Sequence, residues 1–172
     1  MFMLSHVKPE EATGKVAEAY SVMPPQVPVP EPLVLMSASP ELAFQQSGII
    51  RHYLNHERLD MGLLAMIRYL AASAYDYQFC INLNAGILKQ AGEMSEEDLE
   101  ALRNHPEQAP LEESQKALLL FVLKVVKTPN EVEKADIEAL REMGWRDQDI
   151  FDAAYHGTSM VGASMLFKAF SE

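Results

Sequence analysis

Apolar residues recur at intervals of three and four along most of the chain, whereas the strict alternation typical of strands is almost absent. Capping residues, glycines and prolines divide this pattern into segments that we interpret as helices. The expected helices cover residues 9–21, 40–56, 60–75, 77–91, 95–104, 112–127, 130–144 and 148–170. The pattern therefore predicts an all-α helical bundle of about seven or eight helices.

Three segments differ in character from the rest of this pattern. Residues 23–32 contain five of the ten prolines, which favours an extended connector over the surface. Residues 60–75 are apolar on nearly every side, so we expect this helix to be the central one. The last helix, over 148–170, contains small residues such as Gly157 and Gly162, which would let another helix approach closely.

Local signals mark several helix ends. Ser95 with Asp98 is typical of a capping box, and we interpret Asn130 with Glu133 as a second capping pair. Gly144 indicates a helix stop, with a hydrophobic residue just beyond it.

Composition and charge narrow the possible partners. The length of 172 residues, with 48% hydrophobic and 23% charged residues, predicts a single domain spanning 1–172. The net charge of -11 would repel a phosphate backbone, so we expect no nucleic acid partner. Arg68 interrupts the best candidate for a membrane span, so we expect no membrane insertion. The first eight residues have neither a cationic start nor a long apolar run, which favours a cytoplasmic location.

Several stretches are similar to a known family in their order and spacing. They are Pro-Glu-Glu-Ala-Thr-Gly at 9–14, Ser-Ala-Ser-Pro-Glu-Leu at 37–42 and Asp-Ile-Glu-Ala-Leu-Arg at 136–141, followed by the long helix rich in small residues. Together they resemble the AhpD-like, carboxymuconolactone decarboxylase superfamily, particularly its peroxidase-related branch. The resemblance implies an AhpD-like helical bundle and, because relatives form dimers, trimers or hexamers, a homo-oligomer.

The redox motif of that family is degenerate in this chain. Redox members of the family use a Cys-x-x-Cys-x-x-x-His stretch, with a further histidine between the cysteines and a glutamate one helix upstream. If Cys80 matches the second cysteine, Tyr77 replaces the first cysteine, Phe79 the intervening histidine and Asn84 the terminal histidine, and the glutamate falls near Ala65. Disulfide exchange needs a second sulfur, so the two-cysteine mechanism cannot operate.

Cys80 remains the candidate catalytic residue. A helix start can stabilise a thiolate, and peroxide could oxidise such a sulfur to a sulfenic acid that an external thiol restores. The neighbours Phe79 and Ile81 are apolar, however, and a free cysteine is often an inert core residue. Both interpretations stay open at this point.

Arg68 is the main candidate for substrate binding, because a charge in an apolar helix needs a protein carboxylate or a bound anion as its partner. An internal ion pair, or a side chain that snorkels to the edge of the helix, is the structural alternative. Tyr77, Asn84 and His156 could line the same cavity as hydrogen-bonding groups, or could belong to an ordinary satisfied network. A cofactor-free enzyme for a small organic acid would use such groups, as the decarboxylase side of the superfamily implies.

No metal or cofactor is expected. His52 and His56 share one helical face, but two nitrogens without a clear third ligand are a weak signal for a metal. Three hypotheses therefore remain: an AhpD-like protein with one-cysteine chemistry, a non-catalytic ligand-binding or assembly protein on the same scaffold, and the enzyme for a small organic acid. The expected partners are a second copy of the chain and a small ligand or an external thiol.

Overall fold

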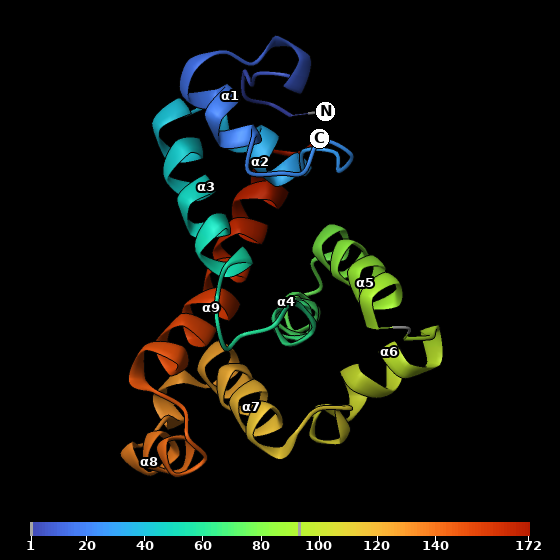
Figure 1. Cartoon of the computed structure of the whole chain (residues 1–172). Helices are drawn as coiled ribbons and strands as arrows, with labels where there is room; N and C mark the ends of the chain where they lie inside the picture. Colours follow the sequence, from blue (N-terminus) through green and yellow to red (C-terminus); the bar gives the residue numbers. More distant parts are fainter. Residues whose placement is uncertain (1, 93) are drawn as a thin grey trace. The chain divides into compact units, whose positions relative to one another are not determined.

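The computed structural model describes residues 2–92 and 94–172, and in these residues the chain forms nine α-helices and no β-strand longer than a single bridge (Figure 1). The helices are α1 (Gly14–Tyr20), α2 (Glu31–Met36), α3 (Pro40–Leu54), α4 (Met61–Ser73), α5 (Gln78–Gly92), α6 (Glu96–Asn104), α7 (Glu113–Lys127), α8 (Lys134–Glu142) and α9 (Asp147–Phe170). The predicted all-α class is confirmed, with one helix more than the upper expectation.

The chain divides into two compact units. Unit 1 comprises Met1–Glu57 with Met165–Glu172, and unit 2 comprises Arg58–Ser164. The single domain expected over the whole sequence stays a prediction.

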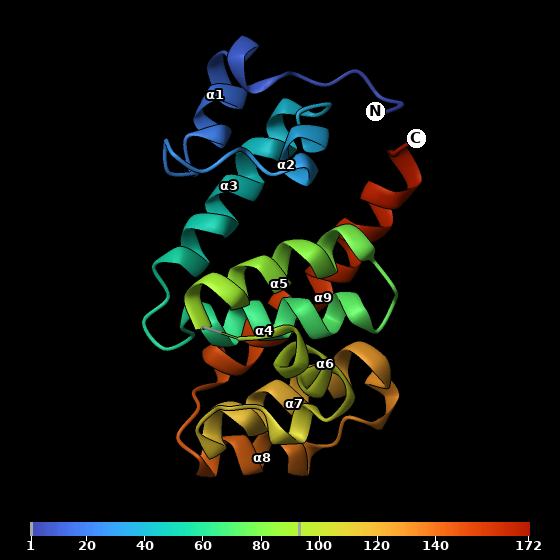
Figure 2. The ribbon, with the colours of Figure 1, turned by 90° about the vertical axis from the view of Figure 1, so that its right-hand side faces the viewer.

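Unit 1 is built on the packing of α1 against α3. Its small core contains Val16, Ala19, Tyr20, Leu33 and Ala43. The Tyr20 hydroxyl donates to the carbonyl of Val7 at 2.7 Å, which ties the N-terminal segment to this core. The first and last described residues of the chain lie side by side (Figure 2), and the backbone N–H of Met3 donates to the carbonyl of Phe170 at 2.9 Å.

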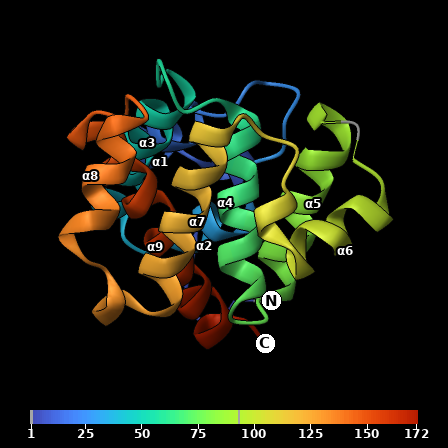
Figure 3. The ribbon, with the colours of Figure 1, turned by 90° about the horizontal axis from the view of Figure 1, so that it is seen from below.

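Unit 2 is organised around α4, as the apolar pattern predicted. Nine of the 13 residues of α4 are buried, because α5 and α7 pack against it on different sides (Figure 3). The helix begins at a side-chain cap, in which the Asp60 carboxylate accepts the backbone N–H of Leu63 at 2.9 Å.

The part of α9 in unit 2 lies very close to α7. A Cβ atom built at Gly157 would lie 2.5 Å from Cγ1 of Val122 and 3.4 Å from Cγ2 of Ile67. Only glycine fits there, so the small residue allows the close approach of a helix that the sequence predicted.

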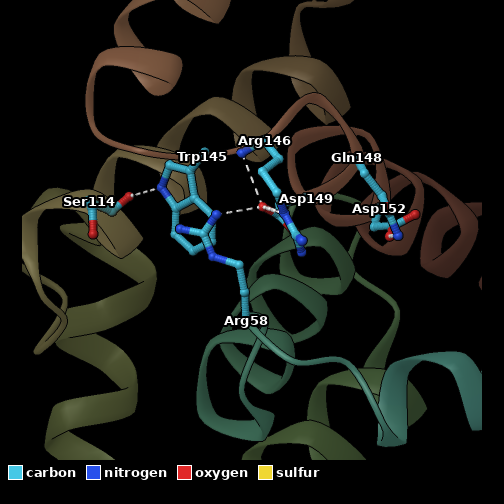
Figure 4. A network of polar contacts seen from close by, with 7 residues as sticks. All are labelled: Arg58, Ser114, Trp145, Arg146, Gln148, Asp149 and Asp152. Carbon is cyan, nitrogen blue, oxygen red and sulfur yellow. Dashed lines mark hydrogen bonds and ion pairs between the residues drawn. The ribbon is translucent and has the colours of Figure 1, made fainter.

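A buried ion-pair network holds the start of α9 (Figure 4). The Asp149 side chain is fully buried and accepts from the backbone N–H, Nε and Nη2 of Arg146 at 2.8–3.0 Å, and from Nη1 of Arg58 at 2.9 Å. The Arg58 guanidinium also lies 4.9 Å from the ring centre of Trp145, whose Nε1 donates to the carbonyl of Ser114 at 2.8 Å. These contacts hold the first turn of α9 in place.

Two expectations for the N-terminal region are wrong. Residues 9–21 do not form one helix, because a 3-10 helix at Pro9–Glu11 ends before α1 begins at Gly14, which has a left-handed φ of +54°. The proline-rich segment is not extended throughout: it turns at Pro24, whose carbonyl accepts the backbone N–H of Val27 at 2.8 Å, and it ends at Pro30. Pro32 lies in the first turn of α2, where a missing N–H costs little, and α2 is the additional helix.

The capping box at Ser95 and Asp98 is confirmed by both of its reciprocal hydrogen bonds. The capping pair expected at Asn130 and Glu133 is wrong. Asn130 belongs to a 3-10 helix, and Glu133 instead forms the capping box of α8 with Asp136.

The helix stop after α8 is confirmed. Gly144 adopts a φ of +90°, and the backbone N–H of Trp145 donates to the carbonyl of Leu140 at 3.1 Å. None of the helices in the described residues is both long and apolar enough to cross a membrane.

Candidate functional site

Five polar residues from three helices of unit 2 meet in its interior, and we call them the Cys80 cluster. They are Arg68 from α4, Cys80 and Asn84 from α5, and His156 and Ser164 from α9. Four of these five were candidates from the sequence, and Ser164 was not.

Cys80 lies in the first turn of α5 with 4% of its surface exposed. The hydroxyl of Ser164, itself 2% exposed, donates to the Cys80 sulfur at 3.1 Å. The same hydroxyl lies 3.6 Å from the sulfur of Met160, so the shorter contact is the one to Cys80. The sulfur therefore already has a hydrogen-bond donor directed at it from α9.

Asn84 follows Cys80 by one helical turn and is completely buried. Its Nδ2 donates to the backbone carbonyl of Cys80 at 2.7 Å. Its Oδ1 is buried, and no hydrogen bond reaches it from any described residue. An acceptor that has lost water without gaining a donor costs about 1–3 kcal/mol, so Asn84 leaves an unmet requirement in the cluster.

Arg68 brings a positive charge to the cluster without a matching anion. Its Nε atom is buried and makes no hydrogen bond, and Arg68 takes part in none of the ion pairs of the described residues. Burial lowers the pKa of the guanidinium from its usual value, and the neighbouring Cys80 sulfur acts in the opposite direction. Arginine nevertheless stays protonated in proteins, so a cation faces the only thiol of the chain.

His156 adds a neutral ring. Burial, followed by the charge of Arg68, lowers the pKa of His156 to about 3, while a hydrogen bond to the backbone of Leu64 raises it only in part. The imidazole is therefore uncharged near pH 7 and adds no second cation beside Arg68. No carboxylate is among the groups that shift the pKa of Arg68 or His156 in the described residues.

The structure also gives ring contacts for other residues named from the sequence. The ring of Tyr77 stacks on Tyr75 with centres 6.1 Å apart, and the Tyr75 hydroxyl donates to the carbonyl of Val126 at 2.9 Å, which places this pair at the α4–α5 turn. The rings of His52 and His56 lie edge to face in unit 1, with centres 5.4 Å apart. Ala65, where the resemblance placed a glutamate, is a buried residue of α4.

Chemically, the cluster can stabilise negative charge on sulfur or on a small oxyanion. Arg68 supplies a full positive charge in a site of low water content, and Ser164 supplies a hydrogen-bond donor. Sequence reasoning could not find Ser164, because it lies 84 residues from Cys80 and one serine in a helix rich in small residues carries no signal.

Comparison with known proteins supports the AhpD-like fold. The structure is similar to an uncharacterized peroxidase-related protein from Silicibacter (TM-score 0.73, 24% identity) and to an alkylhydroperoxidase AhpD core protein from Ralstonia eutropha, also described as uncharacterized and peroxidase-related (TM-score 0.70, 24% identity). Each match covers 83% of this chain and 75% of the other. No family model and no curated protein matches the sequence. The resemblance seen in the sequence is thus confirmed at the level of the fold.

Proposed function

We propose that this chain, with its AhpD-like fold, is a peroxidase-related protein that has lost the two-cysteine redox centre and carries one-cysteine peroxide and thiol chemistry at Cys80. One observation carries the proposal: a half-buried arginine, whose Nε is buried without a hydrogen bond from the described residues, interacts electrostatically with the only thiol of the chain. A cation in that place lowers the free energy of a thiolate and of the negative charge that develops as sulfur reacts.

The proposed reaction needs only a hydroperoxide and an external thiol. The Cys80 thiolate attacks one peroxide oxygen, the O–O bond breaks, and the leaving oxygen takes up the proton that the thiol released. Sulfur is oxidised by two electrons to a sulfenic acid, and the peroxide is reduced to water or an alcohol. One external thiol then displaces water to form a mixed disulfide, and a second releases Cys80 as the free thiol.

Each member of the Cys80 cluster has a defined part in this scheme. Arg68 stabilises the anionic sulfur, and Ser164 holds it through the hydrogen bond of 3.1 Å. His156 stays neutral and therefore does not add a second cation to the site. Because no acid is coupled to the described part of this cluster, we expect proton transfer to use solvent and the rate to be modest.

The burial of Cys80 suggests a small substrate. With 4% of its surface exposed, the residue offers little room for a bulky alkyl group beside the sulfur. We therefore propose hydrogen peroxide, or a hydroperoxide of similar size, as the oxidant.

The test is peroxide-dependent modification of the intact protein. We expect a dione trap to add to Cys80 after peroxide treatment, no addition in Cys80→Ala, and at least about tenfold slower labelling in Arg68→Met. Arg103→Met, on the exposed surface of α6, is the matched control and should label like the parent chain. A thiol that stays unmodified in excess peroxide would overturn the proposal.

A small organic acid as ligand is the second candidate. Arg68 Nε and Asn84 Oδ1 are a donor and an acceptor left over in one site, and a hydroxy acid offers the complementary pair. Calorimetric titration with glycolate, giving binding that Arg68→Met abolishes while peroxide leaves Cys80 intact, would favour this function. If neither binding nor oxidation is observed, the non-catalytic scaffold protein is the remaining hypothesis.

We also propose a cytoplasmic homo-oligomer that uses no cofactor. On α9, Phe151 is 70% exposed and Tyr155 is 42% exposed one turn later, and an exposed aromatic pair of this kind favours burial against another copy. Light scattering that finds only monomer at micromolar concentration would contradict the oligomer.

A further inference from the structure

The Cys80 cluster contains an electrostatic imbalance that the reduced protein does not correct. A charged donor, Arg68 Nε, and a neutral acceptor, Asn84 Oδ1, are both buried without hydrogen bonds from any described residue. Asn84 is completely buried, and Arg68 interacts electrostatically with Cys80. Of these two groups, Arg68 Nε is a donor still available to an anion that forms in the interior of unit 2.

The sulfur of Cys80 is the group best placed to become that anion. It already accepts the Ser164 hydroxyl at 3.1 Å and lies within reach of the charge on Arg68. His156, the other titratable member of the cluster, loses its charge and cannot become negative. An oxygen atom added to the sulfur can accept the Ser164 hydroxyl in place of the sulfur and carries negative charge that Arg68 attracts.

We propose that Cys80 is a modification site at which a second hydroperoxide produces a sulfinate, and that Arg68 holds this sulfinate as its missing counter-ion. The proposal rests on the proposed function, because the first oxidation of Cys80 must occur. It goes further by naming the product that accumulates at Cys80 when peroxide exceeds reductant.

The step balances with hydroperoxide as the only oxidant. The sulfenic acid first loses its proton to solvent. The sulfenate sulfur then attacks one oxygen of hydrogen peroxide, a second S–O bond forms and the O–O bond breaks. The departing hydroxide takes the proton from the newly bound oxygen and leaves as water. Sulfur loses two electrons, the peroxide gains them, and one negative charge remains on the sulfinate.

Two features of the chain favour this product over a disulfide. Cys80 is the only cysteine, so no second thiol of the same chain can capture the sulfenic acid. With 4% of the residue exposed, an external thiol must enter a buried site, whereas a second peroxide is no larger than the first. Arg68 then makes the sulfinate the most stable charge state of the cluster.

The first experiment follows peroxide oxidation by intact mass. We expect the parent chain to accumulate a form with two added oxygen atoms on Cys80. In Arg68→Met we expect at least about a tenfold lower yield of this form relative to the sulfenic acid that precedes it. Arg103→Met is again the surface control and should match the parent chain.

The second experiment needs no peroxide. Cys80→Asp places a carboxylate where the sulfinate would be, and we measure the melting temperature in the parent chain and in Arg68→Met. Cys80→Asp should lower the melting temperature in both backgrounds. We expect the decrease to be smaller in the parent chain than in Arg68→Met by at least about 5 °C. Equal losses in the two backgrounds would overturn the pairing of Arg68 with an anion at this position.

The outcomes separate the two proposals. Absence of any oxidation at Cys80 removes the proposed function, while the coupling between Arg68 and Cys80→Asp still reports on the anion site. Oxidation that stops at the sulfenic acid, or a sulfinate yield that Arg68→Met leaves unchanged, overturns the further inference and leaves the proposed function standing. If Cys80→Asp does not fold, the mass measurement decides alone.

Discussion

Two buried sites of unit 2 use arginine in opposite ways. At the start of α9, Asp149 is fully buried and receives hydrogen bonds from both Arg58 and Arg146. In the Cys80 cluster, Arg68 has a buried Nε with no hydrogen bond from the described residues. The first site has its charges matched and the second does not.

This difference distinguishes a structural network from a candidate functional one. A buried charge that is paired and hydrogen-bonded holds two elements together, and removing one partner is costly. A buried charge with no partner lowers the free energy of unfolding. Its presence is explained most simply by an anion that forms or binds there. Three measurements test this contrast between the two sites.

Loss of Asp149 should have the largest effect. Asp149→Ala removes the acceptor of four hydrogen bonds at a fully buried position, so we expect the free energy of unfolding to fall by about 3–5 kcal/mol. Denaturant unfolding of the two chains measures the difference. A loss below about 1 kcal/mol would show that the network does not hold α9 in place.

Acidification should destabilise the fold through His156. Its folded pKa of about 3 lies below the ordinary value of 6.5, so between these values the unfolded chain binds the extra proton. The stabilisation is therefore complete above pH 6.5 and decreases as pH falls toward 3. The loss should approach about 1.4 kcal/mol per pH unit.

The measurement is the unfolding free energy from pH 7 to pH 4. His156→Gln, which keeps a polar side chain but does not titrate, should give a shallower dependence by that amount. Identical slopes in the two chains would mean that His156 becomes protonated in the folded protein as readily as in the unfolded one.

Replacement of arginine should have opposite signs at the two sites, with the smallest effect at Arg68. Arg68→Met removes an unpaired charge and keeps an unbranched apolar stem, so the free energy of unfolding should stay equal or rise by about 1 kcal/mol. Arg146→Met should lower it instead, because Asp149 loses donors. A large loss of stability in Arg68→Met would place Arg68 among the structural arginines.

Much of the helical architecture was predictable because its signals are local. The capping box of Ser95 with Asp98 and the stop at Gly144 depend on residues a few positions apart. The errors at Gly14 and Pro32 also have local causes, since a left-handed glycine interrupted one expected helix and a proline began another. Such choices between neighbouring conformations involve small free-energy differences that a periodic pattern does not resolve.

The candidate site was only partly predictable. The sequence drew attention to Arg68, because a charge stands out in an apolar helix, and to Cys80, because it is the only cysteine. It grouped Tyr77 with these residues by position in a motif, whereas the ring of Tyr77 lies against Tyr75. It had no means of indicating Ser164, which reaches the sulfur from another helix.

The all-α class, the central place of α4 within unit 2 and the presence of a single cysteine follow from the residues alone, because they depend on residue types and short spacings. The packing of distant helices was needed to bring a serine hydroxyl to the Cys80 sulfur, to make His156 neutral, and to leave Arg68 Nε buried without a hydrogen bond from the described residues. Partnership and burial arise when distant helices pack, and they set the local dielectric on which the strength of every charge depends.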